Sequence, residues 1–201
     1  MKQLLICTRS KGKFPEIVDV LKDLPFSFLN LNDVSAIPPD FDVKETGKTF
    51  SENAILKAET LGSMTGLLAL ADDSGLEVDA LDGRPGVYSH RYATGTDTDR
   101  CRKLLDEMKD VPPEKRGAQF RCVFALFDPQ KEKIATTEGI MRGTIAFESR
   151  GRYGFGYDPI FINETGKTNA ELSTKEKNAI SHRGKALQEM KKVLVYDTRC
   201  G

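Results

Sequence analysis

The stretch from Leu67 to Asp73 most constrains how this chain can fold. Five apolar residues, Leu67 to Ala71, follow one another without alternation, which is typical of a strand buried on both faces of a sheet. Two adjacent carboxylates, Asp72 and Asp73, come next, where we expect that strand to end. The stretch therefore predicts an α/β protein with an acidic turn at a strand end, which is where such sheets bind ligands.

Two interpretations of Asp72-Asp73-Ser74-Gly75 follow from its residue types. Buried carboxylates are unfavourable unless a cation or a hydrogen-bond donor meets them. Hard carboxylate oxygens suit Mg²⁺, which is usually shared between one or two carboxylates and substrate phosphates. Gly75 would let the backbone turn or a ligand approach. The alternative is a solvated turn that merely closes the strand.

The overall charge excludes some classes of protein. The 201 residues are enough for a single domain over 1–201, with one lobe or two. The 30 basic residues are balanced by 30 acidic ones, so the excess of positive charge typical of nucleic-acid or membrane-surface binders is absent. We therefore expect neither nucleic acid nor a membrane as a partner.

The cysteines and the N-terminus indicate a cytoplasmic protein. Neither a membrane-spanning apolar run nor the apolar core of a signal peptide is present. Cys7, Cys101, Cys122 and Cys200 are scattered without a CxxC pair, and two histidines are too few for the usual zinc spacing. We expect reduced thiols.

Turn and cap signals predict alternating strands and helices. Thr49 and Glu52 form a capping-box pattern before a helix to about Leu61, which Gly62 ends. Further helices are expected after Lys13, over 97–108, over 174–178 and after Ser181. Strands are expected at 3–7, 26–31, 67–71, 76–81, 119–127, 133–141, 143–147 and 160–162. The hairpin at about 118–146 is expected to form the core of a second lobe.

The loop after the first strand is a candidate phosphate cradle. A polar loop between a strand and a helix start directs free N–H groups and the positive end of the helix dipole at an anion. A Walker A pattern is absent, and the alternative is an ordinary strand-to-helix turn. The loop consists of Thr8, Arg9, Ser10, Lys11, Gly12 and Lys13.

Three other polar groups stand at helix faces or loops. Asn53 and Lys57, four apart, share one flank of a helix, either facing a cleft or solvent. The Gly- and aromatic-rich loop 151–159 offers a stacking face for a base, or is an ordinary turn. His182 and Arg183 lie in a helix's first turn, where a cation opposes the dipole unless an anion or a base carbonyl is bound. The alternative is a solvent-facing Arg beside a neutral His.

Taken together, the motifs resemble the inosine triphosphate pyrophosphatase family over residues 3 to about 195. The matching stretches are Glu45-Thr46-Gly47, Thr49-Phe50, Glu52-Asn53-Ala54, Lys57-Ala58, Ala71-Asp72-Asp73-Ser74-Gly75-Leu76, Pro85 to Ser89 with Arg91-Tyr92, Gly154-Phe155-Gly156-Tyr157-Asp158-Pro159 and Ser181-His182-Arg183-Gly184.

The resemblance implies a mixed α/β sheet, two lobes with a central cleft, and a homodimer. It implies hydrolysis of dITP, ITP and XTP to the monophosphate and pyrophosphate with Mg²⁺. Asp73 would activate water, and Glu45, Asp72 and Asp73 would form the metal site. Substrate contacts would come from Thr8 to Lys13, Asn53, Lys57, Ser74, Phe155, Gly156, Tyr157, Asp158, Lys177, His182 and Arg183.

Two positions depart from the family pattern. Ser10 stands where the family usually has Asn, and Lys44 precedes Glu45 where many bacterial relatives have a second acid. These departures keep a nucleotide-binding sensor without turnover as an alternative. A pyrophosphatase for other modified nucleotides is a second alternative. RNA binding through Phe155 and Tyr157 is disfavoured by the balanced charge.

Overall fold

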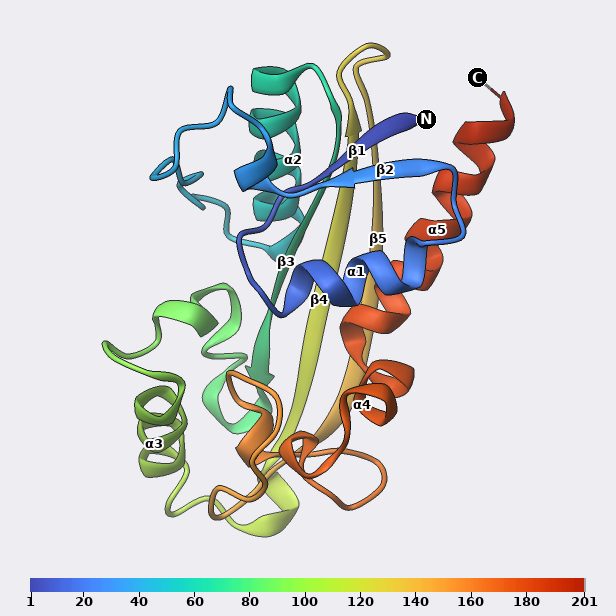
Figure 1. The fold of residues 1–201 in the computed structure, drawn as a ribbon. Coiled ribbons are helices and arrows are strands. Elements are labelled where there is room, and N and C mark those ends of the chain that lie inside the picture. The colour runs from blue at the N-terminus through green and yellow to red at the C-terminus, as the bar shows by residue number, and fades with distance from the viewer. Residues whose placement is uncertain (201) are drawn as a thin grey trace. The chain divides into compact units, whose positions relative to one another are not determined.

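The computed structural model describes residues 1–200, with side chains to residue 196, so the thiol of Cys200 lies outside the described part. The described residues form one six-stranded sheet in the order β2-β1-β3-β4-β5-β6 (Figure 1). β1 pairs in parallel with β2 and β3, and β5 pairs antiparallel with β6. The predicted α/β class with a mixed sheet is therefore confirmed. The strands are β1 (Lys2–Ile6), β2 (Phe26–Leu29), β3 (Leu68–Val78), β4 (Gly117–Asp128), β5 (Lys133–Ile145) and β6 (Phe161–Ile162).

Three helices begin where the cap signals at Thr49, Ser173 and Ser181 place them. Thr49 accepts a hydrogen bond from the Glu52 backbone N–H, as predicted. That helix continues one turn beyond the predicted end, because Gly66, at φ 69°, provides the left-handed C-cap. The helices are α1 (Lys13–Leu21), α2 (Phe50–Thr65), α3 (Asp97–Glu107), α4 (Thr174–Ile180) and α5 (His182–Cys200).

The chain folds into two compact units. Unit 1 contains Met1–Asp73, Cys122–Gly139 and the C-terminal segment from Gly184 onward. Unit 2 contains Ser74–Arg121 and Ile140–Arg183. The hairpin predicted at 118–146 is present as β4 and β5, and its residues are divided between both units.

In unit 1, helices pack on both faces of the sheet. Leu68 and Leu70 of β3 share a buried core with Ile17 of α1 and Leu187 of α5. Ala69, between those two leucines, faces the other way, because a Cβ built on Gly62 of α2 would lie 3.2 Å from it. This alternation follows from the pleat of a strand.

Unit 2 has its own core beneath α3. Leu104 and Met108 pack there with Leu76 of β3, Phe120 of β4 and Phe161 of β6. Arg116 is buried beside this core and donates to the carbonyl oxygens of Ile145, Met108, Val111 and Ala146. Its guanidinium also lies 4.3 Å from the ring centroid of Phe147.

The expected acidic turn is wrong. β3 continues without a break from Leu68 to Val78, so Asp72, Asp73, Ser74 and Gly75 lie inside a strand. Both carboxylates are buried, and each has a hydrogen-bond donor. The strand can continue because side chains from other segments meet the two charges.

Across the described residues, no helix combines the length and the apolar character needed to cross a membrane.

Candidate active site

Asp72 and Asp73 are met by different helices. The Lys13 ammonium, at the start of α1, lies 2.9 Å from Asp72 Oδ2. The Asn53 side-chain amide, on α2, donates to Asp73 Oδ2 at 3.0 Å. Neighbouring residues of a strand point to opposite faces, and α1 and α2 cover opposite faces of β3. The Asp72 carboxylate therefore points to the face of β3 covered by α1, and the Asp73 carboxylate points to the face covered by α2.

Asn53 joins the loop before α2 to the strand. Its side-chain oxygen accepts from the Gly47 N–H at 2.8 Å, while its amide nitrogen donates to Asp73. Asn53 is fully buried. The sequence interpretation of this position as a solvated helix edge is therefore wrong.

Lys57 lies among three carboxylates. Its ammonium donates to Glu45 Oε1 at 2.8 Å. Burial lowers the pKa of Lys57, but Asp72, Asp73 and Glu45 together raise it above its ordinary value. Burial raises the pKa of Asp73 to about 6, with Lys57 and Asn53 opposing the shift and Glu45 and Asp72 adding to it. We call Lys13, Glu45, Asn53, Lys57, Asp72 and Asp73 the carboxylate–lysine cluster.

The carboxylate oxygens of this cluster are of the kind that divalent cations bind. In the part of the chain with described side chains, no three residues among His, Cys, Asp and Glu converge as a ready-made metal cage. Mg²⁺ does not require one, because it usually takes one or two carboxylates and keeps water or phosphate oxygens. The charges of Glu45 and Asp73 both raise the pKa of Lys57, and the charge of Glu45 also raises the pKa of Asp73. Asp72, in contrast, is bound to Lys13.

The loop at Thr8 to Lys13 connects β1 to α1 as predicted. The Ser10 hydroxyl accepts from the Lys13 N–H at 3.3 Å, and Thr8 accepts from the Ser10 N–H at 3.1 Å. Ser10, Lys11 and Gly12 are exposed. Arg9 instead donates to the carbonyl oxygens of Phe41 and Pro38, and it thereby stabilises the loop that contains these two residues.

Unit 2 gathers a second group, which we call the aromatic–cation cluster: Ser74, Phe155, Asp158, Lys177 and Arg183. The Lys177 ammonium lies 4.4 Å from the Phe155 ring centroid, and the Arg183 guanidinium carbon lies 5.5 Å from it. Arg183 also donates to the Ser74 hydroxyl at 3.4 Å. Phe155 is 42% exposed, so this cluster has an accessible aromatic residue beside two cations.

Asp158 connects several residues of this cluster. It is buried and lies 2.5 Å from the Lys177 ammonium. It also accepts from the Phe155 N–H at 2.9 Å and from the Asn169 amide at 3.2 Å. Asp158 therefore fixes the positions of Phe155 and Lys177.

The remaining predicted base contacts are buried side chains. The Tyr157 hydroxyl donates to the Ser89 carbonyl at 2.8 Å, and the His182 ring stacks on Phe120 at 4.8 Å. Arg183 is also buried, so the alternative of a solvent-facing Arg beside His182 is wrong. Gly156 lies in the loop with φ 62°, which favours glycine.

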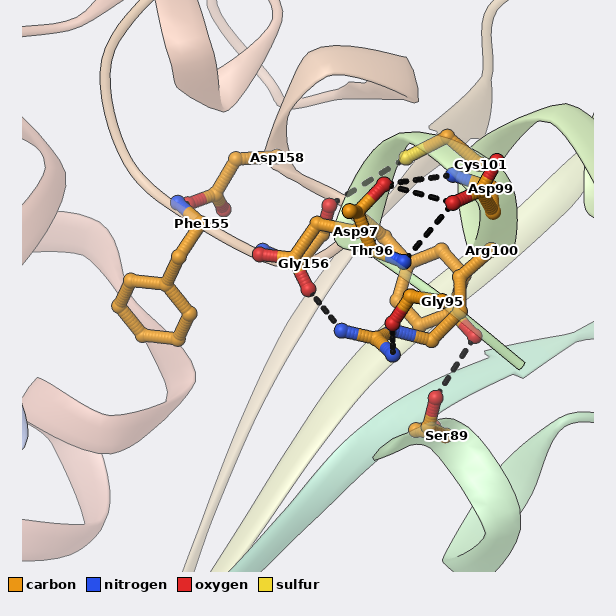
Figure 2. A network of polar contacts seen from close by, with 11 residues as sticks. Ser89, Gly95, Thr96, Asp97, Asp99, Arg100, Cys101, Phe155, Gly156 and Asp158 are labelled. Atoms are coloured by element: carbon orange, nitrogen blue, oxygen red, sulfur yellow. Dashed lines mark hydrogen bonds and ion pairs between the residues drawn. The ribbon is translucent and has the colours of Figure 1, made fainter. Parts of the chain in front are cut away.

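Several supporting residues were not predicted to have a role in the site. Asp97 and Cys101 of α3 both contact Gly156, as Figure 2 shows. Asn169 supports Asp158, and Gly47 supports Asn53. A sequence pattern could identify Asp97 only as an acid in a helix's first turn, because its contact is 59 residues away along the chain.

Unit 1 thus contains the carboxylate–lysine cluster and unit 2 contains the aromatic–cation cluster, in a protein of the α/β class with a mixed sheet. The chain matches the model of the Ham1 family over residues 4–193 and belongs to that family.

Curated relatives cover almost the whole chain. The dITP/XTP pyrophosphatase of Geobacter sulfurreducens is 51% identical over 195 residues, covering 95% of this chain and 96% of the relative. The dITP/XTP pyrophosphatase of Bacillus subtilis is 45% identical over 197 residues, covering 96% and 98%. These relatives confirm the resemblance inferred from the motifs.

Solved structures agree with the fold. A HAM1 protein from Coxiella burnetii has a TM-score of 0.90 at 42% identity, covering 98% of this chain and 100% of that one. The Ham1 protein of Staphylococcus aureus has a TM-score of 0.87 at 38% identity, with the same coverage.

Proposed function

We propose that this protein hydrolyses noncanonical purine nucleoside triphosphates, namely dITP, ITP and XTP, to the monophosphate and pyrophosphate. The carboxylate–lysine cluster carries this proposal, because it combines carboxylates with two lysines that suit a polyphosphate. The names and identities of the relatives support the same activity.

The cluster suggests how the triphosphate is bound. Lys13 and Lys57 would neutralise phosphate charge that otherwise repels a nucleophile. The backbone N–H groups at the start of α1 would hold phosphate oxygens. Glu45 and Asp73 would hold Mg²⁺, which when bound screens and orients the phosphates. Asp72 keeps the Lys13 ammonium in place through the 2.9 Å contact.

Asp73 is the proposed base. A carboxylate with an ordinary pKa is a weak base near neutral pH, and a base works best when its pKa approaches the working pH. Burial raises the pKa of Asp73 to about 6 without a bound cation, and Mg²⁺ beside it would lower this pKa again, so orienting the water matters as much as taking its proton. Asn53 fixes one oxygen of Asp73. We infer that Asp73 orients the attacking water and accepts its proton.

The aromatic–cation cluster is the proposed purine contact. Phe155 offers a stacking face. Lys177 and Arg183 are candidate donors to the 6-oxo group of hypoxanthine and xanthine. Adenine carries an amino group at that position and would leave such donors unpaired, which can lower kcat/KM by several powers of ten.

A nucleotide panel tests the function. Purified protein is incubated with dITP, ITP, XTP, dATP, dGTP and modified pyrimidine triphosphates, with Mg²⁺ and with a chelator, and pyrophosphate is measured. We expect release from dITP, ITP and XTP only, and only with Mg²⁺. Equal kcat/KM for dITP and dATP would contradict the specificity, and absence of turnover with retained binding would indicate a sensor.

We further propose a homodimer that acts on the nucleotide pool of the cytoplasm. Cys7 and Cys101 are buried thiols outside any disulfide, which is consistent with a reducing compartment. Light scattering of the purified protein tests the dimer, for which a monomer mass at micromolar concentration would be the contradicting result.

A further inference from the structure

One helix of unit 2 holds the peptide groups on both sides of Gly156. Asp97, the first residue of α3, accepts the Gly156 N–H through Oδ2 at 2.7 Å. The Cys101 thiol, one turn later on the same helix, donates to the Gly156 carbonyl at 3.3 Å. Figure 2 shows Asp97 and Cys101 together with Gly156 and the neighbouring Phe155.

The Asp97 carboxylate is itself fixed. Its second oxygen is paired with Arg100, which is buried and also donates to the Gly95 carbonyl at 3.4 Å. Burial raises the pKa of Asp97, but the Gly156 N–H and Arg100 together bring it below its ordinary value. The acceptor is therefore ionised at neutral pH, and a hydrogen bond to a charged acceptor is stronger than one between neutral groups.

Gly156 has a backbone freedom that these two hydrogen bonds restrict. Its φ of 62° is one that glycine adopts freely, and a Cβ there would meet nothing within 4 Å. Its neighbours are anchored separately, with Tyr157 bound to Ser89 and the Phe155 N–H bound to Asp158. In Figure 2 the Phe155 ring points away from α3. Because the Phe155 residue is joined directly to the peptide that Asp97 and Cys101 hold, we expect its ring direction to depend on that peptide as well as on Asp158.

We propose that Asp97, assisted by Cys101, is a positioning residue for the purine: by holding Gly156 it fixes the Phe155 ring beside Lys177 and Arg183. The inference rests on the proposed function, because it assigns the Phe155 face to the base. It adds a residue outside the motifs that define the resemblance. Asp97 would touch no substrate atom.

Separate binding of the two parts of the substrate tests this role. Titration calorimetry with Mg²⁺ measures the Kd of IMP, which carries the base, and of tripolyphosphate, which has none. For Asp97→Ala we expect about a 10-fold weaker Kd for IMP, as for the loss of a hydrogen bond to a charged group. The Kd of tripolyphosphate should stay within about twofold. The KM of dITP should rise more than its kcat falls.

Two variants separate positioning from folding. Asp97→Asn keeps a side-chain oxygen that can accept the Gly156 N–H, so it should restore part of the IMP affinity. Asp99→Ala is the matched control, because Asp99 lies in the same helical turn, but its carboxylate bonds to Thr96 within the cap and lies 3.6 Å from Arg102 rather than meeting Gly156. It should lower the melting temperature without changing the ratio of the two Kd values.

A double-mutant cycle tests the route through Phe155. If Asp97 acts by fixing this ring, Asp97→Ala should weaken IMP binding no further in a Phe155→Ala background. An unchanged IMP affinity in Asp97→Ala, or an equal loss for IMP and tripolyphosphate, would overturn the inference. Absence of dITP turnover by the wild-type protein that still binds IMP would instead overturn the proposed function.

Discussion

The Asn53 side-chain amide donates to Asp73 Oδ2 at 3.0 Å, while the same side chain accepts the Gly47 N–H at 2.8 Å. A fully buried side chain thus links a loop, a helix and a strand. An amide can do this because it carries both donors and an acceptor.

Replacing Asp73 tests the proposed base. Asp73→Asn keeps the size and the oxygen that Asn53 contacts but removes the charge. We expect turnover of dITP to fall by at least about 10²-fold, the size typical of losing such a group. Steady-state kinetics measures it, and the melting temperature serves as the control for folding. Near-normal turnover would remove Asp73 from the mechanism.

Gly47 tests how closely the loop must approach α2. A Cβ added there would lie 2.6 Å from Asn53 Oδ1 and 2.7 Å from Glu52 Cβ. Gly47→Ala should therefore lower the free energy of unfolding by about 1–3 kcal/mol, as overpacking usually does. Urea unfolding measures it.

The matched control for Gly47 is Gly12→Ala. At Gly12 the nearest atom to an added Cβ is 3.8 Å away, so stability should change by less than about 0.5 kcal/mol. A destabilisation of equal size in both variants would contradict the role of the close contact at Gly47, because restricting the unfolded backbone by itself stabilises the folded protein.

Arg116 tests the energetics of a buried cation bound mainly by carbonyl groups. It is 2% exposed and donates to four backbone carbonyl oxygens. Arg116→Lys keeps the charge but cannot reproduce the planar fork. We expect a loss of about 2–5 kcal/mol in the free energy of unfolding, because several buried acceptors lose their donors.

Arg102 provides the comparison for Arg116. Its side chain is 69% exposed and lies 3.6 Å from Asp99. Arg102→Lys should leave stability within about 0.5 kcal/mol of wild type. A similarly small effect at Arg116 would mean that water replaces its carbonyl contacts.

Cys101 makes stability depend on pH at the alkaline end. Burial raises the pKa of its thiol from 9.0 to about 12, with Asp97 and Asp158 adding to the shift. Between these values the folded protein keeps a proton that the unfolded chain releases, so stability falls as pH rises. The free energy of unfolding falls by about 1.4 kcal/mol for each pH unit between the two pKa values. Well below pH 9 the thiol is protonated in both states, so stability does not depend on its titration there.

The variant Cys101→Ala isolates this effect from the titration of other groups. The difference in the free energy of unfolding between wild type and variant should shrink by about 2 kcal/mol between pH 8 and pH 10.5. Urea titrations at both pH values measure it. A difference that does not change with pH would show that the folded thiol ionises at its ordinary pKa.

Sequence patterns predicted several helices of this fold correctly, because caps and helical spacing depend on residues that are close together in the chain. The Thr49 cap, the buried side of α2 and the inward residues of α5 follow from a cap or from helical spacing, and all three are present. The end of the first apolar strand was predicted wrongly. Two adjacent carboxylates ordinarily stop a buried strand, and nothing near them in the chain indicates otherwise.

The sequence by itself determined which residue types stand at the ends of strands and the starts of helices, and with them the family resemblance. Only the tertiary structure decided that Asp72 and Asp73 could remain inside β3, because Lys13 and Asn53 reach them from 59 and 20 residues away. It likewise decided that Asp97 meets Gly156. The energy of burying a charge depends on its neighbours in space, which spacing along the chain does not specify.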